Sequence, residues 1–362
     1  MPVVSANLTP AVFTELMNLV DQGRYATPEQ FVKVAVFNQL TVERAAVETA
    51  EGPLSGGVAA AIQKRKPKAG PAAVLPSQWK DSVFDDLDIK ATLDRLALPP
   101  NGDCREFPHV PEGIGMQPIW GQVNRMFPLK LACRWILLRS CEGPAWPKLN
   151  LALDQIPREA GVVGRFLESL DVAAGRTREE ALSAGLPKAG KLSSSDRFAG
   201  QYLARVSRAD RIHPGVVFQL GLACLAGDEV QLTCRGKELA MLENPVLDQE
   251  FTSAKQTLSV EERSFLVAHI IDSVPAERND QLCVLRAIRD GHLTPAGLLS
   301  YIRASFPREW SDLEFRTHVY GILARLTELG QIRRARAGRN VHYRLTDRAL
   351  EMVERLGKEK IA

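Results

Sequence analysis

The feature that most restricts how this chain can fold is an arginine-rich stretch near its carboxyl end, residues 331–344. It holds five arginines and no acidic residue. Two short strand-like runs, 331–335 and 341–346, flank a Gly338-Arg339-Asn340 turn, which is the pattern of a β-hairpin. A hairpin that carries only positive charge indicates an anionic partner, and a simple solvated face is the alternative.

A helix is predicted directly upstream of this hairpin. Ser311 and Glu314 have the spacing of a capping box, so the helix begins beside them. The side that packs inward is marked by apolar residues at helical spacing: Phe315, Val319, Ile322, Leu323, Leu326 and Leu329. The opposite side carries small and polar residues, with basic residues beside them: Thr317, Tyr320, Gly321, Ala324, Arg316, His318 and Arg325. Small and polar side chains would let this side approach the edges of bases.

The order of helix, basic hairpin and closing helix (347–356) resembles a winged helix-turn-helix domain, here expected over residues 261–362. The resemblance implies a recognition helix and a wing that contact duplex DNA. The expected DNA-contact residues are Arg316, Thr317, His318, Tyr320, Arg325, Arg333, Arg334, Arg336, Arg339 and His342.

Length and composition agree with a multidomain globular protein. A chain of 362 residues with 45% hydrophobic and 25% charged residues should form two or more domains. The net charge is only +3, so a nucleic-acid site must come from local clustering of basic residues. Six scattered cysteines without a CxxC pair favour a reducing, cytoplasmic location. We expect neither a signal peptide nor a membrane span, because no apolar run approaches about 20 residues.

The first fifty residues have the pattern of a strand followed by two helices. Residues 3–9 are strand-like, Pro10 suits the first turn of one helix, and Thr27-Pro28 opens the next. So short a segment cannot bury its apolar residues alone, which favours dimerisation through the strands. Residues 7–10, 23–29 and 31–36 carry a resemblance to the ribbon-helix-helix family of repressors and antitoxins.

That resemblance implies a homodimer whose paired strands lie in the major groove of DNA. Ser5 and Asn7 would then read bases, while Thr27 at a helix start, with Arg24 nearby, would bind a phosphate. The strand departs from DNA-reading members of the family because it contains no Lys or Arg. A module that only dimerises, or an unrelated helical hairpin, therefore remains as an alternative.

Residues 51–80 are rich in Gly, Pro and Ala and predict a flexible basic linker. Residues 81–190 predict a helical region with apolar helices at 127–138 and 156–170, the second interrupted by glycines. Trp120, Trp135 and Trp146 are expected in its core, and a platform on which bases stack is the alternative.

Residues 191–260 predict a second, degenerate winged helix. The expected elements are a helix at 196–206, an apolar helix from Pro214, a turn, a strand, and a closing helix. Leu-Thr-x-Arg precedes a helix both here, at 232–235, and at 345–348. The turn here contains Asp228 and Glu229, so this unit should repel phosphate. It is expected to pack internally or to contact a protein.

The sequence gives no sign of an enzyme, a cofactor or a metal site. It contains no Lys-Ser/Thr phosphate loop, HExxH or GxSxG motif, and its six histidines are scattered. An unrecognised active site at 99–147 is the alternative.

The leading hypothesis is a dimeric, sequence-specific transcriptional regulator, mostly α-helical with short β elements. The alternatives are a regulator that senses a ligand in its middle region, and a non-enzymatic DNA-binding adaptor of a plasmid-maintenance or phage-defence assembly. In the adaptor, the middle region would dock a protein partner.

Overall fold

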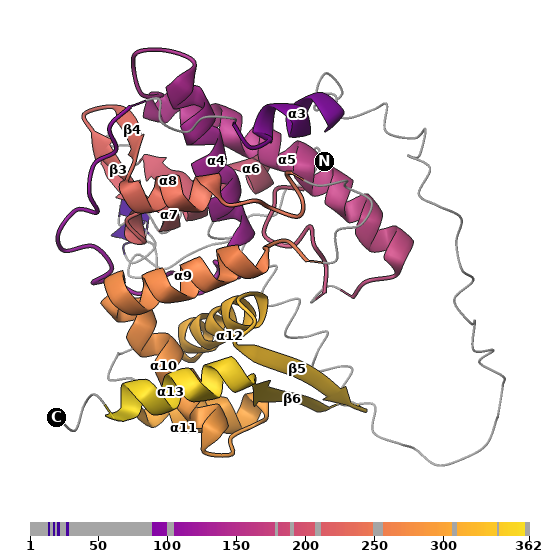
Figure 1. The fold of residues 1–362 in the computed structure, drawn as a ribbon. Helices are drawn as coiled ribbons and strands as arrows, with labels where there is room; N and C mark the ends of the chain where they lie inside the picture. Colours follow the sequence, from indigo (N-terminus) through magenta and orange to yellow (C-terminus); the bar gives the residue numbers. More distant parts are fainter. Residues whose placement is uncertain are drawn as a thin grey trace. The chain divides into compact units, whose positions relative to one another are not determined.

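A computed structural model describes most of the carboxyl-terminal three quarters of the chain (Figure 1). The described ranges are 89–99, 105–177, 180–188, 192–206, 211–248, 256–305, 310–338 and 340–358, with Thr14, Met17, Asn18, Val20, Asp21, Thr27 and Pro28 near the amino terminus. The chain divides into two compact units, residues 1–71 with 205–213 and residues 72–204 with 214–362. The second unit contains nearly all described residues.

The described chain is mostly helical, with short strands in pairs, so the expected fold class is confirmed at this level. The part from α3 to α9 other than residues 205–213, here called the body, surrounds one large hydrophobic core. Its helices are α3 (Ile89–Leu96), α4 (Phe127–Cys141), α5 (Leu149–Ala174), α6 (Leu192–Phe198), the π-helix η1 (Ala199–Leu203), α7 (Val216–Gln219), α8 (Cys234–Met241) and α9 (Val260–Ser273). The strands in this stretch are β1 (Ala204–Val206), β2 (Ile212–Pro214), β3 (Ala223–Ala226) and β4 (Glu229–Leu232).

The predicted helix at 127–138 is confirmed as α4, which is buried nearly all round and forms the centre of the body. The predicted helix at 156–170 is part of a longer helix, α5, which begins at Leu149 and is not interrupted. Gly164 faces the carbonyl of Pro187 and the side chain of Leu186, so this glycine serves close packing instead of ending the helix. In the 191–260 region, the expected helix at 196–206 ends as η1 and β1, and α7 is a single turn.

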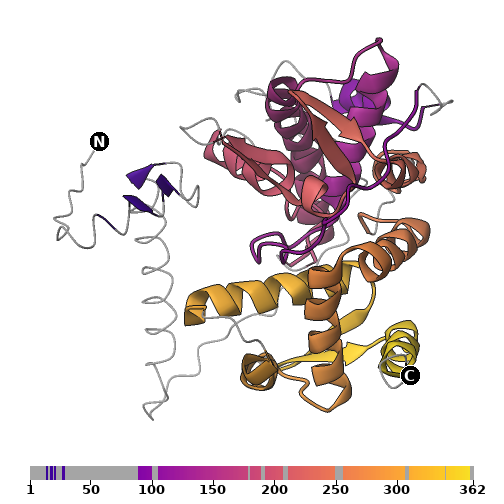
Figure 2. The same ribbon diagram turned by 90° about the vertical axis from the view of Figure 1, so that its left-hand side faces the viewer.

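The carboxyl-terminal part, here called the C-terminal module, has its own core. Its elements are α10 (Pro275–Arg289), α11 (Pro295–Ser305), α12 (Asp312–Glu328), β5 (Ile332–Ala337), β6 (Asn340–Leu345) and α13 (Asp347–Lys358). Both expected signals at its centre are confirmed: Ser311 and Glu314 form a capping box, and β5 and β6 form an antiparallel hairpin. Figure 2 shows α12 along the side of the module that faces the body.

A buried ion pair joins three helices of the body. Lys130 Nζ of α4 lies 2.9 Å from Glu262 Oε1 of α9, and neither side chain is exposed. Lys130 also donates to the carbonyl oxygens of Leu239 and Ala240 at the end of α8. Glu262 in addition accepts from Asn244 and from the backbone N–H of Ser259. Burying both charges is costly, so the pair should make stability depend on pH.

Burial lowers the pKa of Lys130 from 10.5 to about 8, and it raises the pKa of Glu262 above 4.5. Between about pH 8 and 10.5 the unfolded chain therefore holds more protons at Lys130, and the free energy of unfolding should rise with pH. Glu262 acts in the acid range: its contribution is complete below pH 4.5 and is lost as the pH rises through its folded-state pKa.

Urea unfolding at a series of pH values should show both slopes in the unaltered protein. Both slopes should be smaller in the double variant Lys130→Met/Glu262→Gln, in which the amide introduced on α9 can keep the capping contact with Ser259. Identical pH profiles for the two proteins would show that the pair does not control this dependence.

Candidate nucleic-acid interface

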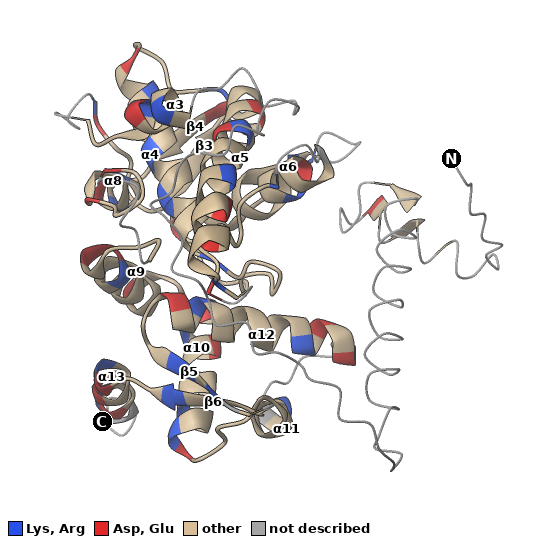
Figure 3. Cartoon of the chain, turned by 90° about the vertical axis from the view of Figure 1, so that its right-hand side faces the viewer, with Lys and Arg blue, Asp and Glu red and all other residues tan. Residues whose placement is uncertain are grey.

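The β5–β6 hairpin carries basic residues on both of its faces. In the register of the strands, Arg333 lies opposite Arg344 and Ala335 opposite His342, and side chains alternate between faces along each strand. Arg333 and Arg344 are exposed, whereas Ile332 and Tyr343 of the other face are buried in the module's core. Arg334 and Arg336 follow Ile332 on that second face, half-buried and exposed respectively. Figure 3 shows the basic residues on β5 and β6.

Two of these arginines repel each other across the hairpin. Like charges directly opposite on neighbouring strands destabilise a sheet, by up to about 1 kcal/mol. The Arg333–Arg344 pair is therefore an arrangement that an anion lying across the outer face would relieve. Arg344 was missing from the residues expected to bind DNA. Arg333 and Arg344 are equally far from the tip of the hairpin, and a two-residue turn places such residues opposite each other. That spacing could have identified Arg344 from the sequence.

The inward side of α12 agrees with the sequence prediction. The six apolar residues expected there are all buried: Phe315, Val319, Ile322, Leu323, Leu326 and Leu329. The other side of the helix is divided. Leu313, Arg316, Thr317 and Tyr320 form an exposed or half-buried line, here called the outer strip of α12. Part of the rest of that side lies against Gly121 and Val123 of the body.

The structure corrects the expectation that His318 and Arg325 face a duplex, because both are buried. His318 Nε2 lies 2.8 Å from Asp280 Oδ2 of α10, and its ring packs on Trp310. Arg325 pairs with both carboxylate oxygens of Glu277, at 2.9 Å each, and donates to the carbonyl oxygen of Val123 at 2.6 Å. Both side chains therefore hold α12 in place and have no surface for a ligand.

The contact between α12 and the body depends on two glycines. The backbones of Gly321 and Gly121 touch, and Gly121 also lies against the backbone of Thr317 and His318. One turn beyond Arg325, Glu328 accepts hydrogen bonds from the backbone N–H of Met126 and of Phe127, where α4 begins. Burial raises the pKa of Glu328. The C-terminal half of α12 is thus fixed to the body, and only its N-terminal half remains open.

Four predicted DNA-contact residues, Ser5, Asn7, Arg24 and Arg339, lie outside the described residues. Thr27 is described as half-buried, directly before the helical residue Pro28. Among the remaining candidates, Arg316, Tyr320, Arg333 and Arg336 are exposed, while Thr317, Arg334 and His342 are half-buried.

The β3–β4 and β5–β6 hairpins are closed by the same arrangement of hydrogen bonds. Thr233 donates from its hydroxyl to the carbonyl oxygen of Gly221 at 2.7 Å, and from its N–H to Leu222. Thr346 makes the corresponding bonds to Gly330, at 3.0 Å, and to Gln331. Both glycines end a helix with positive φ.

A further correspondence involves the second strand of each hairpin. This strand also pairs with a segment that follows an earlier helix: Val230 N–H donates to Pro147, and Tyr343 N–H donates to Leu293. The repeat of Leu-Thr-x-Arg in the sequence therefore marks two similar local structures.

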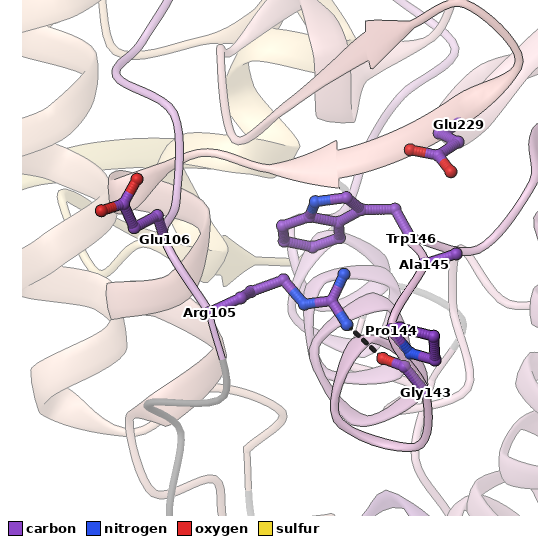
Figure 4. Close-up of a pocket in the computed structure, with 7 residues that line it drawn as sticks. All are labelled: Arg105, Glu106, Gly143, Pro144, Ala145, Trp146 and Glu229. Atoms are coloured by element: carbon purple, nitrogen blue, oxygen red, sulfur yellow. Dashed lines mark hydrogen bonds between the residues drawn. The ribbon is translucent and has the colours of Figure 1, made fainter.

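A shallow pocket of about 460 Å³ lies beside the β3–β4 hairpin (Figure 4). The guanidinium of Arg105 lies 4.7 Å from the ring centre of Trp146, and it donates to the carbonyl oxygens of Ser140 and Gly143. Glu106 and Glu229 complete the lining with residues 143–145. The two carboxylates make the pocket unfavourable for phosphate, so it is no part of the basic surface.

The cysteines depart in one place from the expectation of a fully reduced chain. Cys141, at the end of α4, is disulfide-bonded. The other described cysteines are thiols: Cys133, Cys224, Cys234 and Cys283.

Within the ranges that the structure describes, no cluster of three or more His, Cys, Asp or Glu side chains is placed to bind a metal ion. None of the described helices combines the length and the apolar character that crossing a membrane requires. The chain shows no match to a protein-family model, and no significant similarity to a curated protein or to a solved structure.

Proposed function

We propose that this protein binds duplex DNA through its C-terminal module, acting as a winged helix-turn-helix with β5–β6 as the wing. The observation that carries the proposal is the hairpin itself. It presents Arg333, Arg336 and Arg344 to solvent and sets two of them in mutual repulsion. The sequence from Gln331 to Thr346 itself contains no acidic residue. A row of phosphates is the biological anion that matches several arginines along one hairpin.

The order of elements supports the same proposal. α11 and α12 follow α10, and the wing comes directly after α12, as in domains that place the last helix in the major groove. Arg316, Thr317 and Tyr320 on the outer strip of α12 would then read base edges from the open half of the helix. Two such units in tandem, with the first degenerate, would explain the repeated closure at Thr233 and Thr346.

The specific role we propose is a sequence-specific transcriptional regulator that dimerises through residues 1–50. An adaptor of a larger DNA-processing assembly is the second candidate. It is favoured by the body, a large folded part whose hairpin turn carries Asp228 and Glu229 and so resembles no DNA site. Selection of binding sites from random DNA separates the two roles: a palindromic consensus supports the dimeric regulator, and the absence of enrichment supports the adaptor.

The DNA proposal is tested by replacing the three exposed wing arginines. Binding of the full chain to a 30-bp duplex should weaken with salt, with a slope of roughly −4 in a log–log plot if four to five phosphates are neutralised. The triple variant Arg333→Ala/Arg336→Ala/Arg344→Ala should lose about 100-fold in affinity near physiological salt, and its slope should fall by roughly 3. Fluorescence anisotropy at several salt concentrations measures both.

A variant with the same change of net charge is the control. Lys90, Arg158 and Lys188 are exposed on the body, and their replacement by Ala should leave affinity within about twofold. Equal losses in the two triple variants would mean that only net charge matters, and the wing assignment would be wrong. No binding by the unaltered chain would reject the DNA proposal as a whole.

A further inference from the structure

Trp120 was expected in the core with Trp135 and Trp146, but it is 47% exposed, whereas those two are buried. Its place is on the loop of residues 115–123, which crosses from the start of α10 to α12. A tryptophan offers one of the largest apolar surfaces of any side chain, and folding normally covers most of it. Its exposure beside α12 therefore requires an explanation.

The loop that carries Trp120 is fastened at several points. The carbonyl oxygen of Gly115 accepts from Ala276 N–H at 2.9 Å, and Gly121 lies against the backbone of α12. Ile119 and Val123, on either side of the tryptophan, are fully buried. A turn with a hydrogen bond from Val123 N–H to the Trp120 carbonyl closes the loop. The indole is thus held outward by its neighbours and does not hang from a loose segment.

The backbone of Trp120 lies next to a contact with the outer strip of α12. Its chain neighbour Gly121 touches the backbone of Thr317, and consecutive Cα atoms are about 3.8 Å apart, so the indole starts within a side chain's reach of that strip. Two further apolar side chains are exposed on the strip, Leu313 at 58% and Tyr320 at 45%. The exposed side chains of Trp120, Leu313 and Tyr320 therefore come from two segments whose backbones meet at Gly121 and Thr317.

Around the start of α12, Arg303 and Arg316 balance Asp312 and Glu314, so the positive charge that would attract an anionic partner comes from the wing. The acidic residues at the start of α12 are engaged within the module. Asp312 lies 3.1 Å from Arg303, and Glu314 is bound by Ser311 in the capping box. Arg316 is exposed on the same strip, and the wing adds its arginines.

We infer that Trp120 is a DNA-contact residue supplied by the body, which extends the reading surface of α12 beyond the C-terminal module. This inference rests on the proposed function. The indole ring would contact the apolar parts of the duplex, the sugars and the thymine methyl groups, next to the residues that read base edges. Its N–H adds one donor for a base edge or a phosphate.

The test uses the full chain with a 30-bp duplex. Trp120→Ala should weaken binding about 5- to 20-fold with the salt slope unchanged, because no charge is removed. Trp120→Phe should keep most of the affinity. Val172→Ala, which shortens a side chain 77% exposed on α5, is the control and should bind as the unaltered protein does.

A duplex containing 5-iodouracil gives a second, independent readout. Near-ultraviolet light should cross-link the unaltered protein at Trp120, as identified by mass spectrometry, and the cross-link should disappear in Trp120→Ala. If Trp120→Ala proves unstable, the cross-link formed by the unaltered protein tests the inference without that variant. Its absence from a duplex that binds with full affinity overturns the inference.

The outcomes also separate this inference from the proposed function. Normal DNA binding by Trp120→Ala, together with a loss in the wing variant, rejects the role of Trp120 and leaves the wing in place. Binding of apolar peptides without any binding of duplex DNA would reject both the role of Trp120 and the proposed function.

Discussion

Replacing Arg325 by methionine should lower the free energy of unfolding by about 3–5 kcal/mol, the cost of breaking a buried ion pair by removing one partner. The guanidinium is fully buried and pairs with both oxygens of Glu277 at 2.9 Å. Without it, Glu277 would keep only the hydrogen bond from Gln281 at 2.7 Å and would lie in the interior as an uncompensated charge. Chemical unfolding monitored by circular dichroism measures the loss.

A double variant distinguishes the ion pair from simple loss of packing. Arg325→Met/Glu277→Leu removes both charges, and its stability should return to within about 2 kcal/mol of the original value. Arg316→Met changes an exposed arginine of the same helix and should alter stability by no more than about 0.5 kcal/mol. If the single variant Arg325→Met lost less than about 1 kcal/mol, the pair would not be what fastens α12.

The role of Arg325 could not be read from the sequence. The spacing of apolar residues in α12 correctly identified the side that packs in the module's own core, because that pattern is local. The second packing surface of the helix consists of a glycine, a histidine and an arginine, which look like a solvent-exposed or ligand-binding side. Their partners, Glu277, Asp280 and Gly121, are 38 to 200 positions away in sequence, and nothing local indicates them.

Three predictions that depended on neighbouring residues were confirmed. The capping box at Ser311, the hairpin turn near Gly338 and the apolar helix α4 each result from interactions within a few residues. The repeated Leu-Thr-x-Arg also pointed to a real similarity, since Thr233 and Thr346 make matching hydrogen bonds.

Predictions that needed tertiary context failed. Gly164 was interpreted as a helix interruption although it serves close packing, and Trp120 was assigned to the core because residue type alone favours burial.

Helix propensities and the contact between Gly321 and Gly121 predict opposite effects of Gly321→Ala on stability. In an isolated helix, Ala is more favourable than Gly by about 1 kcal/mol, so Gly321→Ala should stabilise α12 by itself. In the folded protein, however, the added Cβ would lie 2.9 Å from the Cα of Gly121, and even closer to its carbonyl oxygen. These are backbone atoms, so relief requires a shift of the loop that carries Trp120.

Such a shift would strain the hydrogen bonds from Arg325 to Val123 and from Met126 to Glu328. We therefore expect Gly321→Ala to lower the free energy of unfolding by about 2–4 kcal/mol, at the upper end of what overpacking costs. Gly143→Ala is the matched control and should be neutral, because a Cβ there meets no atom within 4 Å. Hydrogen exchange should localise the change to residues 115–123 and α12. A Gly321→Ala protein as stable as the original would mean that the close contact between Gly321 and Gly121 is not needed to hold the loop against α12.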